Sequence, residues 1–146
     1  MFDTFAKNTL GPLILRVALG VIFIYHGLGK VNQDTDWGAT WQQRGGMANP
    51  HPAPMQMAYA WGELVGGVAL ALGLLTRLAA LGAIALMVGA IYEVHWHHFE
   101  GEPVFDVTKG GFEYNFAIIM MCLALVVTGP GRMAIDAVFF RRRPAS

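Results

Sequence analysis

Residues 61–87 read WGELVGGVALALGLLTRLAALGAIALM, and this stretch decides the fold. Two apolar runs, 55–75 and 78–94, meet here with only Thr76 and Arg77 between them. Each run approaches the roughly 20 apolar residues with which an α-helix crosses a bilayer. Because two residues leave room only for a tight turn, and lipid-exposed backbone must be hydrogen-bonded internally, the two runs predict an antiparallel helical hairpin.

Two further apolar runs, 10–31 and 112–127, predict one helix before the hairpin and one after it. After the last run, TGPGR ends the helix, and MAIDAVFF predicts a short interfacial helix with Arg132 and Asp136 as an i,i+4 pair. The predicted fold is an all-α membrane protein. It is an antiparallel four-helix transmembrane bundle with a short C-terminal interfacial helix, in one domain over residues 1–146.

The composition of the chain supports a membrane protein. Of the 146 residues, 55% are hydrophobic and only 14% are charged, against about a quarter in an ordinary soluble domain. Ten basic and ten acidic residues leave no positive surplus for phosphate backbones, which argues against nucleic acid as a partner. A single cysteine, Cys122, excludes an internal disulfide and a Cys-rich metal site.

The distribution of basic residues predicts the orientation in the cytoplasmic (inner) membrane. Four spans place both termini on one side, and the positive-inside rule makes that side cytoplasmic. The side of the termini holds Lys7, Arg77, Arg132, Arg141, Arg142 and Arg143, and the other side holds Lys30, Arg44 and Lys109.

Small residues at helical spacing predict close contacts between helices. Gly20 and Gly27 are seven residues apart on one helix face, and Gly62 and Gly66 form a GxxxG motif. Both pairs are predicted to pack helix against helix, since a missing Cβ lets two backbones approach.

Ionisable residues inside the spans need a specific explanation, because each costs at least about 2–3 kcal/mol at mid-membrane. His26, Glu63, Glu93 and Glu113 come from four different helices and fall in the same outer half. Alternative interpretations are that Glu93 and Glu113 reach the headgroup level, that His26 is a packing residue, and that Arg16 snorkels to the inner face or pairs with a lipid phosphate. Glu63 lies deepest and requires a partner or a functional role.

A histidine-rich run, HWHH, follows the third span. Glu93 and His97 are i,i+4 neighbours, and His95 and His98 are i,i+3 neighbours, so the set predicts ligands for zinc or copper. The alternative is a solvated cluster at the membrane boundary without metal.

Three stretches together resemble the DoxX family of small four-helix membrane proteins: RVALGVIFIYHGLGK, the hairpin of residues 61–87, and GFEYNFAIIMMCLALVVTGPGRMAID. The resemblance implies a compact bundle in the cytoplasmic membrane. Several members are associated with oxidoreductase complexes, including the DoxD-type subunit of a thiosulfate:quinone oxidoreductase. The residues that carry the likeness are Arg16, His26, Gly27, Lys30, Glu63, Gly66, Gly67, Gly73, Arg77, Glu113 and the TGPGR turn.

The leading functional hypothesis is a membrane subunit of a redox-linked complex that binds a quinone-type lipid in the outer half. His26 is expected to donate a hydrogen bond to the quinone, and Glu63 to relay protons. The other residues assigned to the quinone site are Tyr25, Lys30, Trp61, Tyr92, Glu93, Glu113 and Tyr114. A protein partner subunit is expected to carry the redox centre. The alternatives are a non-catalytic membrane scaffold for a partner complex and an outer-face metal-binding protein.

Overall fold

The computed structural model describes residues 5–32, 52–95, 105 and 111–139, and it confirms the predicted all-helical fold. In order along the chain, the elements are η1 (Ala6–Leu10), α2 (Gly11–Val31), α4 (Ala53–Leu72), α5 (Thr76–Ala90), η2 (Ile91–His95), α6 (Glu113–Thr128) and α7 (Ile135–Phe139). The helices begin and end within a few residues of the predicted apolar runs. Long apolar segments without helix-breaking residues are typical of helices, so their ends are visible in the sequence.

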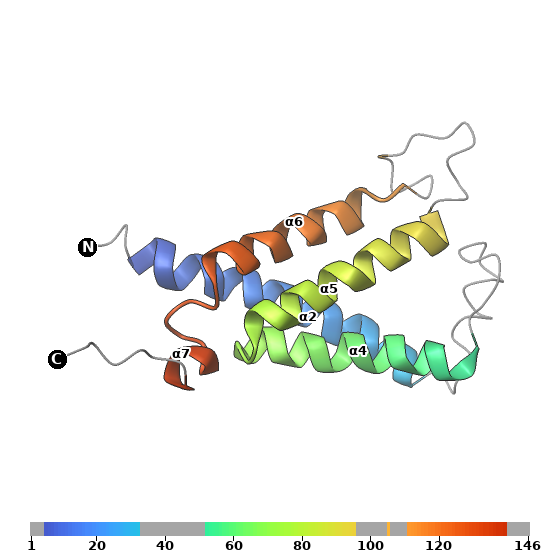
Figure 1. The fold of residues 1–146 in the computed structure, drawn as a ribbon, viewed down its shortest axis with the longest axis horizontal. Coiled ribbons are helices and arrows are strands. Elements are labelled where there is room, and N and C mark those ends of the chain that lie inside the picture. The colour runs from blue at the N-terminus through green and yellow to red at the C-terminus, as the bar shows by residue number, and fades with distance from the viewer. Residues whose placement is uncertain (1–4, 33–51, 96–104, 106–110, 140–146) are drawn as a thin grey trace.

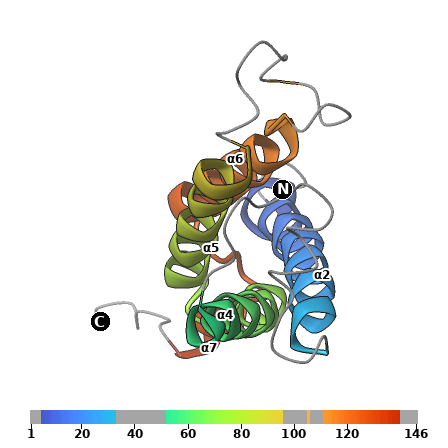
Figure 2. The same cartoon turned by 90° about the vertical axis from the view of Figure 1, so that its right-hand side faces the viewer.

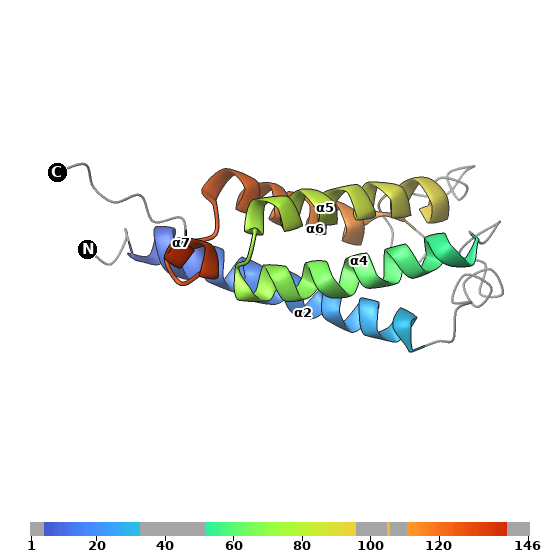
Figure 3. The ribbon, with the colours of Figure 1, turned by 60° about the horizontal axis from the view of Figure 1, so that its bottom comes forward.

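The four long helices of the described chain form two layers (Figures 1 and 3). The first layer is α2 packed along α4, and the second is α5 packed along α6. Figure 2 shows the same helices end-on. A core between the layers contains Leu19, Phe23, Leu70, Ile118 and Leu125. The start of the first helix and α7 lie at one end of the bundle, called here the terminal end.

The turn of the hairpin lies at Gly73–Leu75 and not at Thr76 and Arg77, which already belong to α5. Gly73 has φ 71°, a left-handed conformation that suits glycine, and Leu74 N–H donates to Ala69 O at 2.8 Å, as in a Schellman motif. Leu75 is also left-handed, with φ 47°. The prediction was wrong here because Thr76 and Arg77 look polar, whereas the conformation that reverses the chain is adopted by Gly73.

The C-terminal segment packs against this turn. As predicted, the chain leaves α6 at the TGPGR sequence, and a short helix, α7, follows. The predicted Arg132–Asp136 pair does not form: α7 begins at Ile135, and both oxygens of Asp136 accept backbone N–H groups, from Leu75 at 2.7 Å and Thr76 at 2.8 Å. Asp136 therefore caps α5 from a distant part of the chain.

Three glycines, Gly20, Gly27 and Gly67, form a seam between α2 and α4. A Cβ on Gly27 would lie 2.5 Å from Leu64 N, and one on Gly67 would lie 2.7 Å from Ile24 N. The prediction for Gly20 and Gly27 is confirmed, but that for the GxxxG pair is wrong. A Cβ on Gly66 would meet nothing within 4 Å, and one on Gly62 only the tip of Leu86. A GxxxG motif places two glycines on one helix face, but it does not specify what that face contacts. Here the two glycines line a cavity.

Two stretches of the described chain, Ala6–Val31 and Thr76–Glu93, are long and apolar enough to cross a membrane. The α6 helix is apolar but shorter. Large apolar side chains point outward along the bundle, among them Ile14, Val21, Val65, Leu78 and Val127. This exposed apolar surface is what a lipid environment would cover.

Candidate functional site

A buried ion pair joins α2 to α4 in the half of the bundle away from the terminal end. Lys30 Nζ lies 2.5 Å from Glu63 Oε1, and the two side chains are only 17% and 7% exposed. The second carboxylate oxygen, Glu63 Oε2, is buried and has no hydrogen-bond partner in the described part of the chain. A buried charge is stable only when paired, so Lys30 supplies the partner that the depth of Glu63 requires.

The glycine seam positions this pair. Gly27 is one helical turn before Lys30, and it packs directly on the backbone of Leu64, the residue after Glu63. Since no side chain separates the helices at this point, the backbones of α2 and α4 approach closely and Lys30 reaches Glu63. A larger residue at Gly27 would push apart the two helices that carry the pair.

Two amide side chains are also buried in the bundle, and the sequence analysis missed both. Gln56 is 3% exposed and lies two turns before Glu63 on the same face of α4. Asn115 is 7% exposed, and its Nδ2 donates to Met87 Sδ at 3.6 Å. The seven-residue spacing of Gln56 from Glu63 is a signal in the sequence, because it places both side chains on one helix face.

His26 does not share the buried position of Glu63. Its side chain is exposed on α2, one turn before Lys30, and its ring meets Tyr25 edge-on at a centroid distance of 5.6 Å. Tyr25, Trp61, Tyr92 and Tyr114 are all exposed as well. These aromatic residues therefore lie on the outer surface of the bundle and do not enclose Glu63.

The two remaining carboxylates assigned to the site lie near the helix ends, away from the terminal end. Glu93, in η2, is half-buried and interacts electrostatically with Tyr59 of α4. Glu113 is half-buried at the first residue of α6, where a negative charge is favourable at a helix N-terminus. Both are consistent with positions at the membrane boundary.

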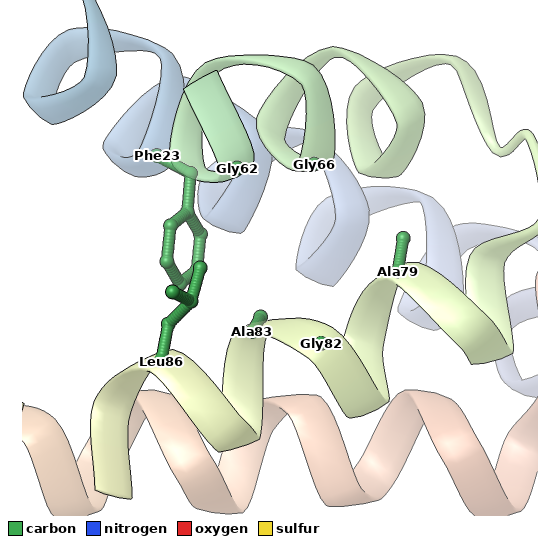
Figure 4. Close-up of a pocket in the computed structure, with 7 residues that line it drawn as sticks. All are labelled: Phe23, Gly62, Gly66, Ala79, Gly82, Ala83 and Leu86. Atoms are coloured by element: carbon green, nitrogen blue, oxygen red, sulfur yellow. The ribbon is translucent and has the colours of Figure 1, made fainter. Parts of the chain in front are cut away.

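An apolar cavity of about 290 Å³ lies between α4 and α5. Figure 4 shows its walls: Gly62 and Gly66 of α4 face Ala79, Gly82 and Ala83 of α5, and Phe23 and Leu86 close one end. Gly62 and Gly66 flank Glu63 in sequence, so the cavity begins beside the helix turn that carries the ion pair. Its small side chains leave room for an apolar group.

A second buried charge, Arg16, lies at the terminal end and is only 1% exposed. Its Nη1 donates to Ala71 O at 3.3 Å and its Nη2 to Met133 O at 3.1 Å. The expectation that Arg16 snorkels or pairs with a lipid phosphate is therefore wrong. Gly73 makes room for the guanidinium, since a Cβ there would lie 2.2 Å from Nη1.

The predicted metal ligands fall mostly outside the described residues. His97 and His98 are not described, and His95 is the last residue of η2. No group of three metal-binding side chains occurs among the residues that the structure describes. The metal hypothesis for Glu93 and these histidines stays a prediction. Cys122 is buried in α6, as expected for an inert thiol.

The order of these features along the chain matches a known family. A family model described as DoxX matches residues 11–96, more than half of the chain. The chain belongs to the DoxX family. The matched region of this DoxX protein contains α2, α4 and α5, and with them the glycine seam and both residues of the ion pair.

Curated relatives match this DoxX protein over nearly its whole length. A Bacillus subtilis (strain 168) protein named "Putative oxidoreductase CatD" is 31% identical over 134 residues, which cover 90% of this chain and 89% of the relative. Inner membrane protein YqjF of Escherichia coli (strain K12) is 29% identical, with 91% and 95% covered. Inner membrane protein YphA of the same organism is 28% identical, with 92% and 94% covered. No solved structure matches the chain significantly.

Proposed function

We propose that this DoxX protein is an integral membrane subunit of a redox-linked complex and binds a quinone-type lipid against Lys30 and Glu63. The four long helices span the inner membrane with both termini in the cytoplasm, so the ion pair lies in the outer half. The names of the relatives support this: two are inner membrane proteins, and the name of CatD includes oxidoreductase.

The proposal depends on the carboxylate of Glu63, of which only one oxygen has a hydrogen-bond partner among the described residues. One oxygen accepts from Lys30, while the other is buried without a partner among the described residues. A buried polar atom of this kind costs about 1–3 kcal/mol when no group bonds to it. A structural role alone would not require that cost, whereas a hydrogen-bonding ligand would remove it.

The residues present fit a quinone. The Lys30 ammonium carries three N–H donors, so it can donate to Glu63 and to a carbonyl oxygen together. Glu63 Oε2 can hold a proton within reach of the same ligand. The cavity lined by Gly62 and Gly66 fits an apolar tail. When bound, a quinone supplies two-electron, two-proton chemistry at its carbonyl oxygens.

The roles of the chain's own residues follow from this geometry. Lys30 orients the ligand and pairs with Glu63 in the resting protein, and Glu63 exchanges a proton with the ligand. His26 is exposed one turn away on α2, where it is placed to donate a hydrogen bond to a ligand arriving from the lipid side. One cysteine cannot hold an iron–sulfur cluster, so we assign the electron carrier to a partner subunit.

Quinone retention tests the proposal. The chain is purified in a mild detergent from cells that make quinone, and bound quinone is extracted and quantified by chromatography. We expect close to one quinone per chain in the wild-type protein and a loss of most of it in Glu63→Gln and Lys30→Gln. The matched control is Arg77→Gln, which removes a charge from an exposed position at the terminal end.

The copurifying material separates the alternatives. A wild-type protein without quinone, but in a stable complex with a partner, would replace this proposal with the scaffold function. Stoichiometric zinc or copper without quinone would favour the metal site of His95, His97 and His98. Equal quinone in all four proteins would show that the lipid binds elsewhere.

A further inference from the structure

A groove of about 540 Å³ lies at the terminal end, between the turn that follows α6, helix α7 and η1. It is called here the terminal groove. Asn8, Thr128 and Arg132 contribute polar groups to its lining, and Ala137 and Val138 of α7 contribute an apolar wall. It lies far from the Lys30–Glu63 pair, at the other end of the molecule.

The polar side of the terminal groove carries hydrogen-bond donors that could bind an anion. Arg132 is exposed, and its side chain makes no hydrogen bond to any described residue. Its backbone N–H donates to Asn8 O at 3.2 Å, which ties the two polar residues to one another. Thr128 already donates its hydroxyl hydrogen to Ala124 O at 2.7 Å. The donors that remain for an anion are the Arg132 guanidinium and the Asn8 amide.

The residues that line the groove include no carboxylate. The acidic residue of α7, Asp136, is buried, and its oxygens face the start of α5. The attraction of Arg132 for an anion is therefore not cancelled from within the groove. Arg77, whose Nη2 would lie 3.4 Å from a Cβ on Gly129, is not among the residues that line the groove.

The apolar side of the groove indicates a lipid and not a free ion. Val127, Val138 and Phe139 are each at least 76% exposed around it, at the level where α6 ends and the polar turn begins. A guanidinium beside exposed apolar side chains matches a phospholipid, in which one glycerol carries a phosphate and two acyl chains. The cytoplasmic leaflet, which the proposed topology places at this end, is rich in anionic lipids.

We infer that the terminal groove binds the phosphate of an anionic phospholipid from the inner leaflet, with Arg132 and Asn8 as donors and Ala137 and Val138 against its glycerol and acyl region. This site is independent of the quinone proposal, because it uses none of the same residues. The lipid would join α6, α7 and η1.

Native mass spectrometry of the delipidated full-length protein in detergent tests this inference. The probes are phosphatidylglycerol, diacylglycerol as the matched lipid without phosphate, and inorganic phosphate. We expect wild-type protein to bind phosphatidylglycerol at least about fivefold more tightly than diacylglycerol. Arg132→Gln should lose roughly fivefold in phosphatidylglycerol affinity, and Asn8→Leu should lose affinity to a smaller extent.

The control is Arg77→Gln, which removes the same charge from the same end of the bundle but from outside the groove. Its phosphatidylglycerol affinity should stay within about twofold of wild type. Equal losses in Arg77→Gln and Arg132→Gln would show a general attraction to the basic end and overturn the site. Unchanged affinity in Arg132→Gln would also overturn it. Inorganic phosphate that binds alone and displaces the lipid would make this a free-phosphate site and contradict the lipid assignment.

Discussion

Two regions of this bundle bury charged side chains, and they use them differently. At the terminal end, Arg16 donates to two backbone carbonyls, and both oxygens of Asp136 accept from backbone N–H groups. Of the polar atoms of these two side chains, only Arg16 Nε is buried without a partner in the described chain. In the opposite half, Glu63 uses one oxygen on Lys30 and leaves the other without a partner. The terminal charges bind backbone and hold the fold, whereas the Lys30–Glu63 pair leaves one acceptor unused, and we propose that a ligand occupies it.

The largest effect is expected from Asp136→Ala at the terminal end. The substitution removes the cap of α5 and leaves Arg16 buried without its nearby negative charge, which should cost about 3–5 kcal/mol of folding free energy. Thermal unfolding in detergent measures the loss. Arg132→Ala, at the exposed residue four positions earlier, is the control and should leave the melting temperature nearly unchanged. A loss of less than about 1 kcal/mol in Asp136→Ala would contradict the claim that the terminal charges hold the fold.

The glycine seam should also be sensitive to substitution. Gly27→Leu forces a side chain against the backbone of Leu64, and such overpacking typically costs about 1–3 kcal/mol. It should also separate Lys30 from Glu63. Gly66→Leu is the matched control, because its side chain would enter the apolar cavity between α4 and α5. Melting temperatures of the two variants test this: a larger loss in Gly66→Leu than in Gly27→Leu would contradict the assignment of the seam.

Two substitutions of Glu63 separate its contribution to folding from its proposed role in quinone binding. Glu63→Gln keeps an oxygen that accepts from Lys30, so the loss of stability should be near 1 kcal/mol, while proton exchange and quinone retention are lost. Glu63→Leu leaves Lys30 buried without a partner and should destabilise the bundle by several kcal/mol. Unfolding curves measured beside extracted quinone distinguish the two. If the Glu63→Gln protein retains quinone-dependent turnover in the assembled complex, Glu63 has only a structural role.

The smallest effect is expected at the hairpin turn. Leu75 is half exposed and left-handed, a conformation that costs a non-glycine residue about 1–2 kcal/mol. Leu75→Gly relieves this strain, but glycine also raises the conformational entropy of the unfolded chain. The net gain in stability should therefore stay below about 1 kcal/mol. Its neighbour Leu74 has an ordinary negative φ, and Leu74→Gly should lower the melting temperature. Equal effects at the two positions would show that Leu75 is not strained.

The sequence predicted the helices well, because apolar length and helix breakers are local properties. It also predicted that Glu63 needs a partner, but it did not give Lys30 that role. Lys30 was counted among the basic residues of the outer side and assigned to the quinone site, whereas the seam at Gly27 brings its side chain to Glu63. Likewise, Arg16 was assigned to the lipid, since nothing local shows that Met133 and Asp136 return from the end of the chain to cover it. Contacts between distant segments depend on how the helices pack, which the local pattern does not specify.

The quinone site is tested most directly by titrating a soluble quinone analogue into purified protein and measuring its affinity in wild type, Glu63→Gln, Lys30→Gln and the double variant. If the pair holds the ligand together, each single substitution should weaken binding by roughly tenfold, and the double variant should lose less than the sum of the two losses. Melting temperatures measured in parallel show that all four proteins are folded. Equal affinity in folded wild-type and Glu63→Gln protein would contradict the account and leave the buried pair as a structural contact.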